Sequence, residues 1–475
     1  MFRIRCIAFL LLLTPAVWPQ DAIDIGNRLE PFVDHLLIDR MSCVTLQLAN
    51  PQPMESVLQF DQPWEGRYCG YVTIFRDGAV VRMYYRGLPE SKADGSDMET
   101  TCYAESADGI HFTRPNLGLY ERNGTRENNI VLAEQAPFSH NFAPFLDERP
   151  GVPAEERFKA LAGLSSTGLV GYVSGDGIHW KKIDEKPLIT KGHFDSQNLA
   201  FWSLQEQCYV SYFRMSTPEG FRWVDRCTSP DFRTWTDPVV MDNGGVPQEH
   251  IYTNQTVPYF RAPHIYLAIA ARFMPGRRAI TTEEATRIGI EKDYAGDCSD
   301  CVLMSSRGGN HYDRTFMEGF IKPEIGPENW TSRTNYPARG LVQTGENELS
   351  MYVQHNYGQT TGYLKRYALR LDGFASVNAP YAGGELQSKP LRFQGSQLHL
   401  NFATSAAGSI RVELVGTNGE AIPGYRLEDA EEVIGNSTDR VVRWKSGGEL
   451  PPVASQPVRL RFAMKDASLY AIQFK

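Results

Sequence analysis

The sequence predicts an all-β protein, built as a five-bladed β-propeller followed by a C-terminal β-sandwich. Three observations lead to this prediction. One short turn motif recurs between residues 30 and 380, at a spacing typical of propeller blades. The segments between its copies are short runs with β-strand composition. Helical periodicity is scarce, and only residues 281–290 have a helical pattern.

The recurring motif is a tight turn that is followed by an aromatic residue. Its clearest copies are Ser-Ala-Asp108-Gly-Ile-His-Phe and Ser-Gly-Asp176-Gly-Ile-His-Trp. Asp231, Gly308 and Asp372 mark three more divergent copies, and the five positions are 68, 55, 77 and 64 residues apart. Because an Asp-Gly turn reverses the chain tightly, we expect the following ring to pack back onto its sheet. Units of this length hold about four strands, as a propeller blade requires.

Predicted strands fill the segments between the turns and continue beyond them. A two-sheet sandwich would also explain many strands, but it would not explain one turn at blade-like spacing. From residue 385 onward, strands continue without the motif, at residues 398–402, 410–414, 441–444, 458–464 and 469–474. The alternation of apolar and polar residues at 458–462 is typical of a half-solvated antiparallel strand. We therefore predict a propeller over residues 30–380 and a separate sandwich over residues 385–475.

The N-terminus has the pattern of a secretory signal. Arg3 and Arg5 precede an almost unbroken apolar stretch over residues 6–18, which is too short to span a membrane. We expect a signal peptide over residues 1–21, with an uncleaved anchor as the alternative. Since no later stretch approaches about 20 apolar residues, the mature chain is expected to be secreted or periplasmic, without a membrane span.

Composition excludes several classes of protein. A net charge of −8 without a long basic run argues against a nucleic-acid partner. Seven cysteines follow the predicted signal, too few for a disulfide scaffold, although the positions of Cys208 and Cys227 would allow a bridge. No cofactor is expected. The acidic stretch from Asp94 to Glu99 offers ligands for a structural calcium ion, but it lacks the pattern of a dedicated loop, which favours a solvated turn.

In a propeller, the first strand of each blade begins at one mouth of the central channel. Polar residues precede the predicted first strands, among them His140, Asn198 and Arg333. Predicted second strands end on the same face in Arg86, Arg214 and Arg272, which would form a cationic ring. Guanidinium groups suit carboxylates and sulfates, so all six side chains are candidates for substrate binding. The alternative is that the arginines bridge neighbouring blades.

Two carboxylates stand out near the starts of first strands. Asp195 precedes the third first strand, and Glu249 precedes the fourth. Cleavage of a glycosidic bond needs one group to protonate the leaving oxygen and a second carboxylate as nucleophile or base. The alternative for either residue is a structural cap of the next blade.

In architecture, the chain resembles the five-bladed propeller glycoside hydrolases, which include invertases, inulinases and arabinofuranosidases. These enzymes place an Asp on the first inner strand, a second Asp two blades later, and a Glu about 50 residues after that; Asp195 and Glu249 match the last two by spacing. Where an invertase has Asn-Asp-Pro-Asn-Gly, this chain has Arg67-Tyr-Cys-Gly-Tyr. Glu65 is therefore assigned to the first position, and Asp34 is expected in the strand that closes the ring.

These expectations combine into a secreted glycoside hydrolase acting on a plant or algal polysaccharide, with acidic (uronate or sulfate) and neutral substrates both left open. Glu249 would be the general acid, Asp195 would orient the sugar and tune that acid, and Glu65 would be the nucleophile or base. The long insertion at residues 272–300 is expected to wall the mouth and to favour cleavage at a chain end. The alternatives are a non-catalytic carbohydrate-binding propeller, or a polysaccharide lyase using Arg with His or Tyr. The sequence specifies no oligomeric state.

Overall fold

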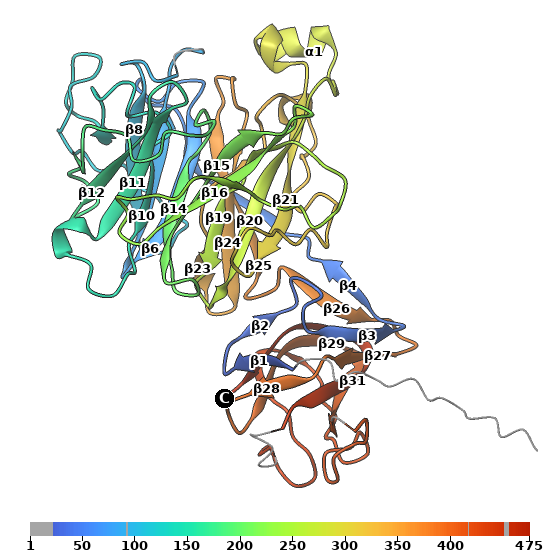
Figure 1. Cartoon of the computed structure of the whole chain (residues 1–475). Coiled ribbons are helices and arrows are strands. Elements are labelled where there is room, and N and C mark those ends of the chain that lie inside the picture. Colours follow the sequence, from blue (N-terminus) through green and yellow to red (C-terminus); the bar gives the residue numbers. More distant parts are fainter. Residues whose placement is uncertain (1–21, 92–93, 417, 451–455) are drawn as a thin grey trace, which may run out of the picture.

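The protein is almost entirely β and has two parts (Figure 1). The computed structural model describes residues 22–91, 94–416, 418–450 and 456–475. The larger part is a five-bladed propeller, and a sandwich-like part lies beneath it. The predicted fold class is therefore confirmed, whereas the predicted signal peptide at residues 1–21 lies outside the described residues.

Each blade is an antiparallel sheet, and in blades 1 to 4 all strands follow one another along the chain. Blades 1 to 3 consist of β6 (Gly70–Asp77), β7 (Val80–Gly87), β8 (Thr100–Ser106) and β9 (Ile130–Leu132); β10 (Ala143–Leu146), β11 (Phe158–Leu164), β12 (Gly168–Ser174) and β13 (Lys181–Lys182); and β14 (Leu199–Ser203), β15 (Cys208–Ser216), β16 (Arg222–Ser229) and β17 (Val239–Val240). Blade 4 consists of β18 (Ile251–Thr253), β19 (Thr256–Tyr259), β20 (Ala262–Met274) and β21 (Cys298–Ser306). In blade 4 the innermost position is shared by β18 and β19, which both pair with β20.

The fifth blade closes the ring with a strand from the other end of the chain. It consists of β22 (Tyr336–Pro337), β23 (Val342–Gly345), β24 (Glu348–His355), β25 (Tyr363–Arg370) and β5 (Gln52–Gln59). Gln59 of β5 lies opposite Tyr363 of β25. The expectation that Asp34 belongs to the closing strand is therefore wrong, because Asp34 lies between β2 (Glu30–Pro31) and β3 (Ile38–Ser42) in the sandwich-like part.

The repeated turn connects each blade to its neighbour. In the turn after β12, Asp176 Oδ1 accepts hydrogen bonds from the backbone N–H of Ile178 and of His179, each at 2.8 Å. Gly177 has φ of 78°, and its carbonyl accepts a 2.9 Å hydrogen bond from the Tyr84 hydroxyl of blade 1. The motif is thus a capped turn that docks on the preceding blade: Trp180 packs edge-on against Tyr84 of blade 1, whereas the sequence predicted only that the ring would pack onto its own sheet.

The sandwich-like part is one folded sheet organised by two long strands. Its strands are β1 (Ile23–Gly26), β2, β3, β4 (Thr45–Leu48), β26 (Ala375–Ala379), β27 (Gly384–Ser388), β28 (Leu391–Phe393), β29 (Leu398–Gly416), β30 (Asn436–Val441) and β31 (Val458–Phe474). Each long strand, β29 and β31, spans two segments that the sequence predicts as separate strands. β31 pairs with β29 along one edge and with β2, β26, β27 and β28 along the other.

The N-terminal strands differ from the predicted boundary at residue 30. Residues 30–48 form β2, β3 and β4, which pair with C-terminal strands and not with a blade. The reason is hydrophobic packing, because Phe32, Leu37 and Val44 are buried in the same cluster as Leu460 and Phe462. The chain therefore starts in the sandwich-like part, passes through the propeller, and returns.

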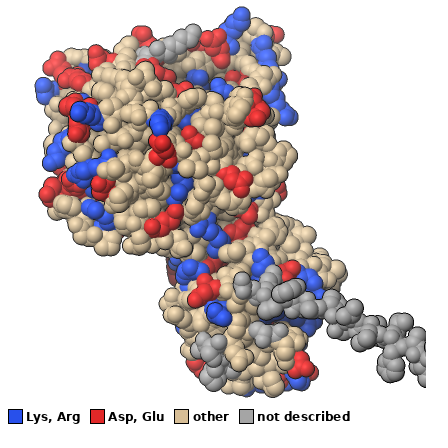
Figure 2. All heavy atoms as spheres, in the orientation of Figure 1, with Lys and Arg blue, Asp and Glu red and all other residues tan. Residues whose placement is uncertain are grey.

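Helices are few and short. α1 (Thr282–Arg287) begins at a capping box in which Thr281 and Glu284 bond to each other's backbone, and it is shorter than the helix expected over residues 281–290. The 3-10 helices are η1 (Ala154–Glu156), η2 (Lys292–Tyr294) and η3 (Pro327–Asn329). None of the helices in the described ranges has the length and apolarity needed to cross a bilayer. Figure 2 shows acidic and basic side chains interspersed over the visible face of the propeller.

Cysteines form no bridge within the described part of the chain. The seven from Cys43 to Cys301 are all free thiols. Cys227 lies opposite Ser211 and therefore three positions from Cys208, so the bridge that the sequence allowed is not formed.

Candidate active site

All five innermost strands begin at one face of the propeller, and this face carries a cluster of arginines and tyrosines. We call it the mouth and define it by Tyr71, Arg86, Arg214, Tyr252, Arg333 and Tyr357. The three arginines come from blades 1, 3 and 5. Tyr71 packs against the cluster that contains Tyr252, so aromatic contacts connect the blades around the channel.

Arg86 is buried at the end of β7, where the sequence placed a substrate-binding cation. Its guanidinium donates to the Asn141 side chain at 3.2 Å and to the Tyr357 hydroxyl at 3.1 Å, and it lies 4.5 Å from the Tyr71 ring centroid. It also pairs at 3.3 Å with Asp94, whose side chain is 50% exposed. Arg86 therefore connects the first and fifth blades and holds one accessible carboxylate at the rim.

Arg214 and Asp195 form a second pair of this kind. The Arg214 guanidinium is ion-paired with Asp195 and lies 4.8 Å from the Tyr252 ring centroid. The arginine is almost fully buried, whereas the Asp195 side chain is 48% exposed. Asp195 can contact a ligand, because the buried Arg214 fixes the position of its carboxylate and one side of that carboxylate faces solvent.

Arg333 differs from the other two because no described carboxylate lies within ion-pair distance of it. Its guanidinium carbon is 5.0 Å from the Tyr294 ring, 5.6 Å from Tyr252 and 6.0 Å from Tyr357. It donates one hydrogen bond, at 3.1 Å, to the Tyr294 hydroxyl. Ring faces stabilise a cation by about 0.5–2 kcal/mol, but they leave its formal charge available for an anionic ligand.

Tyr71 and Tyr357 of the mouth remain protonated at neutral pH. Burial raises the pKa of Tyr357 to about 12 and holds the pKa of Tyr71 well above 10. These side chains therefore act at neutral pH as neutral rings and hydroxyl groups.

The insertion between β20 and β21 reaches across the mouth to other blades. Its Ile280, Ala285 and Ile290 are buried with Tyr68 of blade 1 and with Tyr357 of blade 5. Tyr294, also in the insertion, contacts the Tyr68 and Tyr357 rings at 5.5 and 5.8 Å between centroids. A segment from blade 4 thus covers one side of the mouth between blades 1 and 5.

His140 belongs to a buried network with Glu99, a residue that the sequence suggested only as a calcium ligand or as part of a solvated turn. His140 Nδ1 lies 2.8 Å from Glu99 Oε2, and His140 Nε2 accepts from Asn141 at 2.9 Å. Burial alone would raise the pKa of a carboxyl group, but His140 and Arg86 hold the pKa of Glu99 below its usual range. The position of Glu99, an acidic residue directly before the strand β8, was the sequence feature that could have identified this network.

Asp94, Glu99 and His140 offer ligand atoms within 4.8 Å of one another, close enough for a metal ion. Both ring nitrogens of His140 are already hydrogen-bonded, and Arg86 supplies a cation beside Asp94. The donor set therefore fits a self-contained hydrogen-bonded network, which leaves a metal without an open position.

Glu249 lies in an ion network distinct from that of Asp195. Its carboxylate contacts Arg272 at 3.0 Å and Arg314 at 2.6 Å, and Arg272 also pairs with Asp300 at 2.6 Å. Arg272 is therefore bound to Glu249 and Asp300 and does not belong to the cluster of the three mouth arginines. The structure places Glu249 and Asp195 before neighbouring first strands, but in separate ion pairs.

Glu65 and Asn198 are both fully buried. The Glu65 side chain is bound to the Tyr85 hydroxyl at 2.7 Å and to Arg114 at 2.9 Å, and burial raises its pKa. Asn198 donates to the Phe194 carbonyl at 3.1 Å and so supports the backbone ahead of β14. Neither side chain is exposed to the mouth in this structure.

No protein-family model matches the chain, and no curated protein matches it. Similar solved structures include BT0996 in complex with RGII, at 10% identity and a TM-score of 0.44 over 67% of this protein and 92% of that one. An N-acetylgalactosamine deacetylase from F. plautii matches at 12% and 0.41, over 69% and 96%. A family 43 arabinoxylan arabinofuranohydrolase from Bacillus subtilis matches at 13% and 0.39, over 87% and 97%. With TM-scores below 0.5, these likenesses carry no argument about function.

Proposed function

We propose that the protein is a secreted glycoside hydrolase that acts at the mouth on an anionic polysaccharide of plant or algal origin. The observation that carries this proposal is Arg333, a cation held among tyrosine rings without a described carboxylate partner. A partly buried charge without a carboxylate in ion-pair contact is unfavourable, so a uronate or sulfate group at this position would offset it. Guanidinium groups bind both anions through paired hydrogen bonds.

Asp195 is the first catalytic residue in this proposal. Its carboxylate is half exposed and held in place by Arg214, as a nucleophile or base would need to be. Asp94 is the second half-exposed carboxylate at the mouth, and it is held by Arg86, which lies over the Tyr71 ring. It takes the place that the sequence gave to Glu249 or Glu65, since Glu65 is buried and two arginines hold Glu249 elsewhere.

Cleavage from a chain end follows from the insertion. A long polysaccharide needs an open groove on both sides of the scissile bond, but residues of the insertion pack against blades 1 and 5 and cover one side. Tyr294 of the insertion also contacts Arg333, so the anion of a terminal sugar would be bound beside this wall.

The test compares matched carboxamide variants on acidic and sulfated oligosaccharides. We expect Asp195→Asn to lower kcat/KM at least 100-fold, a loss of about 2.7 kcal/mol of transition-state stabilisation. Glu249→Gln is the matched control, and it should change kcat/KM less than tenfold. Full turnover by Asp195→Asn would refute the assignment, and a large loss in Glu249→Gln alone would return the acid role to Glu249.

One observation favours a second function, that of a polysaccharide lyase. The Arg333 guanidinium lies beside the Tyr294 hydroxyl, and a lyase requires a cation to neutralise a uronate together with a group that transfers a proton. Products with a new carbon–carbon double bond, detected by ultraviolet absorbance, would identify this reaction. Calorimetric binding of a glycan without any product would instead indicate a binding protein.

A further inference from the structure

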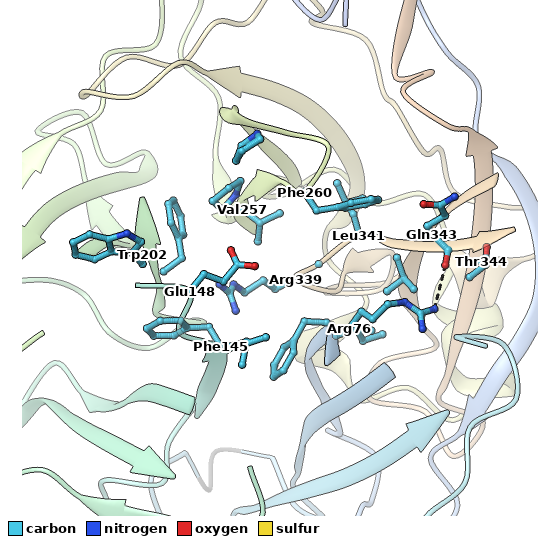
Figure 3. Close-up of a pocket in the computed structure, with 18 of the residues that line it drawn as sticks. Arg76, Phe145, Glu148, Trp202, Val257, Phe260, Arg339, Leu341, Gln343 and Thr344 are labelled. Carbon is cyan, nitrogen blue, oxygen red and sulfur yellow. Dashed lines mark hydrogen bonds between the residues drawn. The ribbon is translucent and has the colours of Figure 1, made fainter. Parts of the chain in front are cut away.

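The end of the channel opposite the mouth opens into a cavity of about 950 Å³ (Figure 3). We call it the lower cavity. The last residues of the innermost strands β6, β10, β14, β19 and β23 line it, so all five blades contribute. Its volume falls within the range of about 300–1,000 Å³ that is typical of small-molecule sites.

Aromatic side chains form much of its wall. Phe145 and Phe201 are buried behind the surface, and Trp202 stands beside them. Phe260 is 48% exposed, so one ring presents an uncovered apolar face at the rim. Exposed large aromatic groups at a concave surface are typical of ligand sites.

Polar groups of both kinds project among these rings. Glu148 points into the cavity and offers acceptor oxygens from an exposed side chain (Figure 3). Arg76 donates to the Gln343 carbonyl at 3.2 Å, and its exposed guanidinium brings a donor to the rim.

The charges of the lining balance. Arg76 and Arg339 are matched in number by Glu148 and Glu346. This differs from the mouth, where Arg333 has no described carboxylate in ion-pair contact. An anion in the lower cavity would meet Glu148, and a purely apolar ligand would cover Glu148 without giving it a partner, which costs about 1–3 kcal/mol per group.

We infer that the lower cavity binds a neutral oligosaccharide and is a second glycan site, separate from the mouth. A sugar ring has apolar C–H faces that pack on Phe260 and on the other rings. Its hydroxyl groups both donate and accept, so they can bind Glu148 and Arg76 together. This inference does not depend on which reaction takes place at the mouth.

Calorimetric titration of the full chain tests it with three neutral probes: cellotetraose, xylotetraose and mannotetraose. We expect at least one to bind wild type, and Phe260→Ala to weaken that binding at least fivefold. Tyr381→Ala is the matched control, because Tyr381 is 66% exposed and lies in the sandwich-like part; it should leave the affinity unchanged. Failure of all three probes to bind, or equal affinity in Phe260→Ala, would overturn the inference.

An acidic probe separates this result from the proposed function. Trigalacturonate should bind wild type and Phe260→Ala equally, and Arg333→Met should abolish its binding at the mouth. If only the neutral probe fails, the lower cavity is not a glycan site while the mouth proposal stands. If Phe260→Ala weakens both probes by the same factor, they share one site, and the inference of a second site fails.

Discussion

Replacing Gly177 with alanine should weaken the contact between blades 1 and 2. Gly177 has φ of 78°, and a non-glycine residue in this left-handed region costs about 1–2 kcal/mol. The new Cβ atom would also lie 2.6 Å from the Tyr84 hydroxyl oxygen, which is shorter than any normal contact. The hydroxyl must then move and lose its 2.9 Å hydrogen bond, and a buried group left unpaired costs about 1–3 kcal/mol. The free energy of unfolding should therefore fall by about 2–5 kcal/mol.

Gly151→Ala separates the two costs. Gly151 has a similar φ of 76°, but a Cβ atom added there would meet nothing within 4 Å. Urea unfolding, followed by tryptophan fluorescence, should show that Gly151→Ala loses only the backbone term. In a Tyr84→Phe background, Gly177→Ala should cost less than in wild type, because the hydrogen bond is already gone and only the 2.9 Å contact with Arg82 Nη1 remains. Equal destabilisation by the two alanine variants in wild type would refute the proposed role of the turn.

Acid stability and thiol reactivity provide two further predictions. Burial would raise the pKa of Glu30, but His264 and Arg307 hold this pKa below its usual range. The ionised carboxylate therefore stabilises the folded protein fully above the unfolded pKa of about 4.3, and this contribution is lost as the pH falls. Between about pH 6 and about pH 3.5, Glu30→Gln should therefore lose less unfolding free energy than wild type does, and equal losses would contradict this. A thiol reagent should label the exposed Cys43 well before the five buried cysteines, including Cys69 and Cys301, whose pKa values burial raises. Rapid labelling of all seven by the folded protein would contradict the burial.

The parts of the fold that local chemistry determines could be predicted from the sequence. The Asp-Gly turn at Asp176 is recognisable because its cap, its glycine and its following ring lie within five residues. The local sequence pattern was also sufficient to predict that Asp195 and Arg333 lie just before first strands. Ring closure by β5 is different, because Gln59 pairs with Tyr363 about 300 residues away and no local pattern records that partner.

Burial of the predicted carboxylates depends on partners that are distant in sequence. Glu65 follows a turn that resembles the start of a first strand, but Arg114 and Tyr85 enclose it. Glu249 precedes β18 as predicted, yet Arg314, 65 residues later, binds its carboxylate. Residue type and spacing therefore identified carboxylates near the correct face, whereas their exposure depended on these distant arginines.

Arg339 explains why the two ends of the channel can select ligands of different charge. Its guanidinium donates to the carbonyls of Pro144 and Ala200, each at 2.8 Å, and so crosses the channel from blade 5 to blades 2 and 3. Burial lowers its pKa to about 10, which still leaves it protonated at neutral pH. A ligand in the lower cavity therefore has a cation at its floor and the carboxylates of Glu148 and Glu346 in the same lining. A ligand at the mouth meets Arg333, which has no described carboxylate within ion-pair distance, so we expect an acidic sugar to be attracted more strongly there than in the lower cavity.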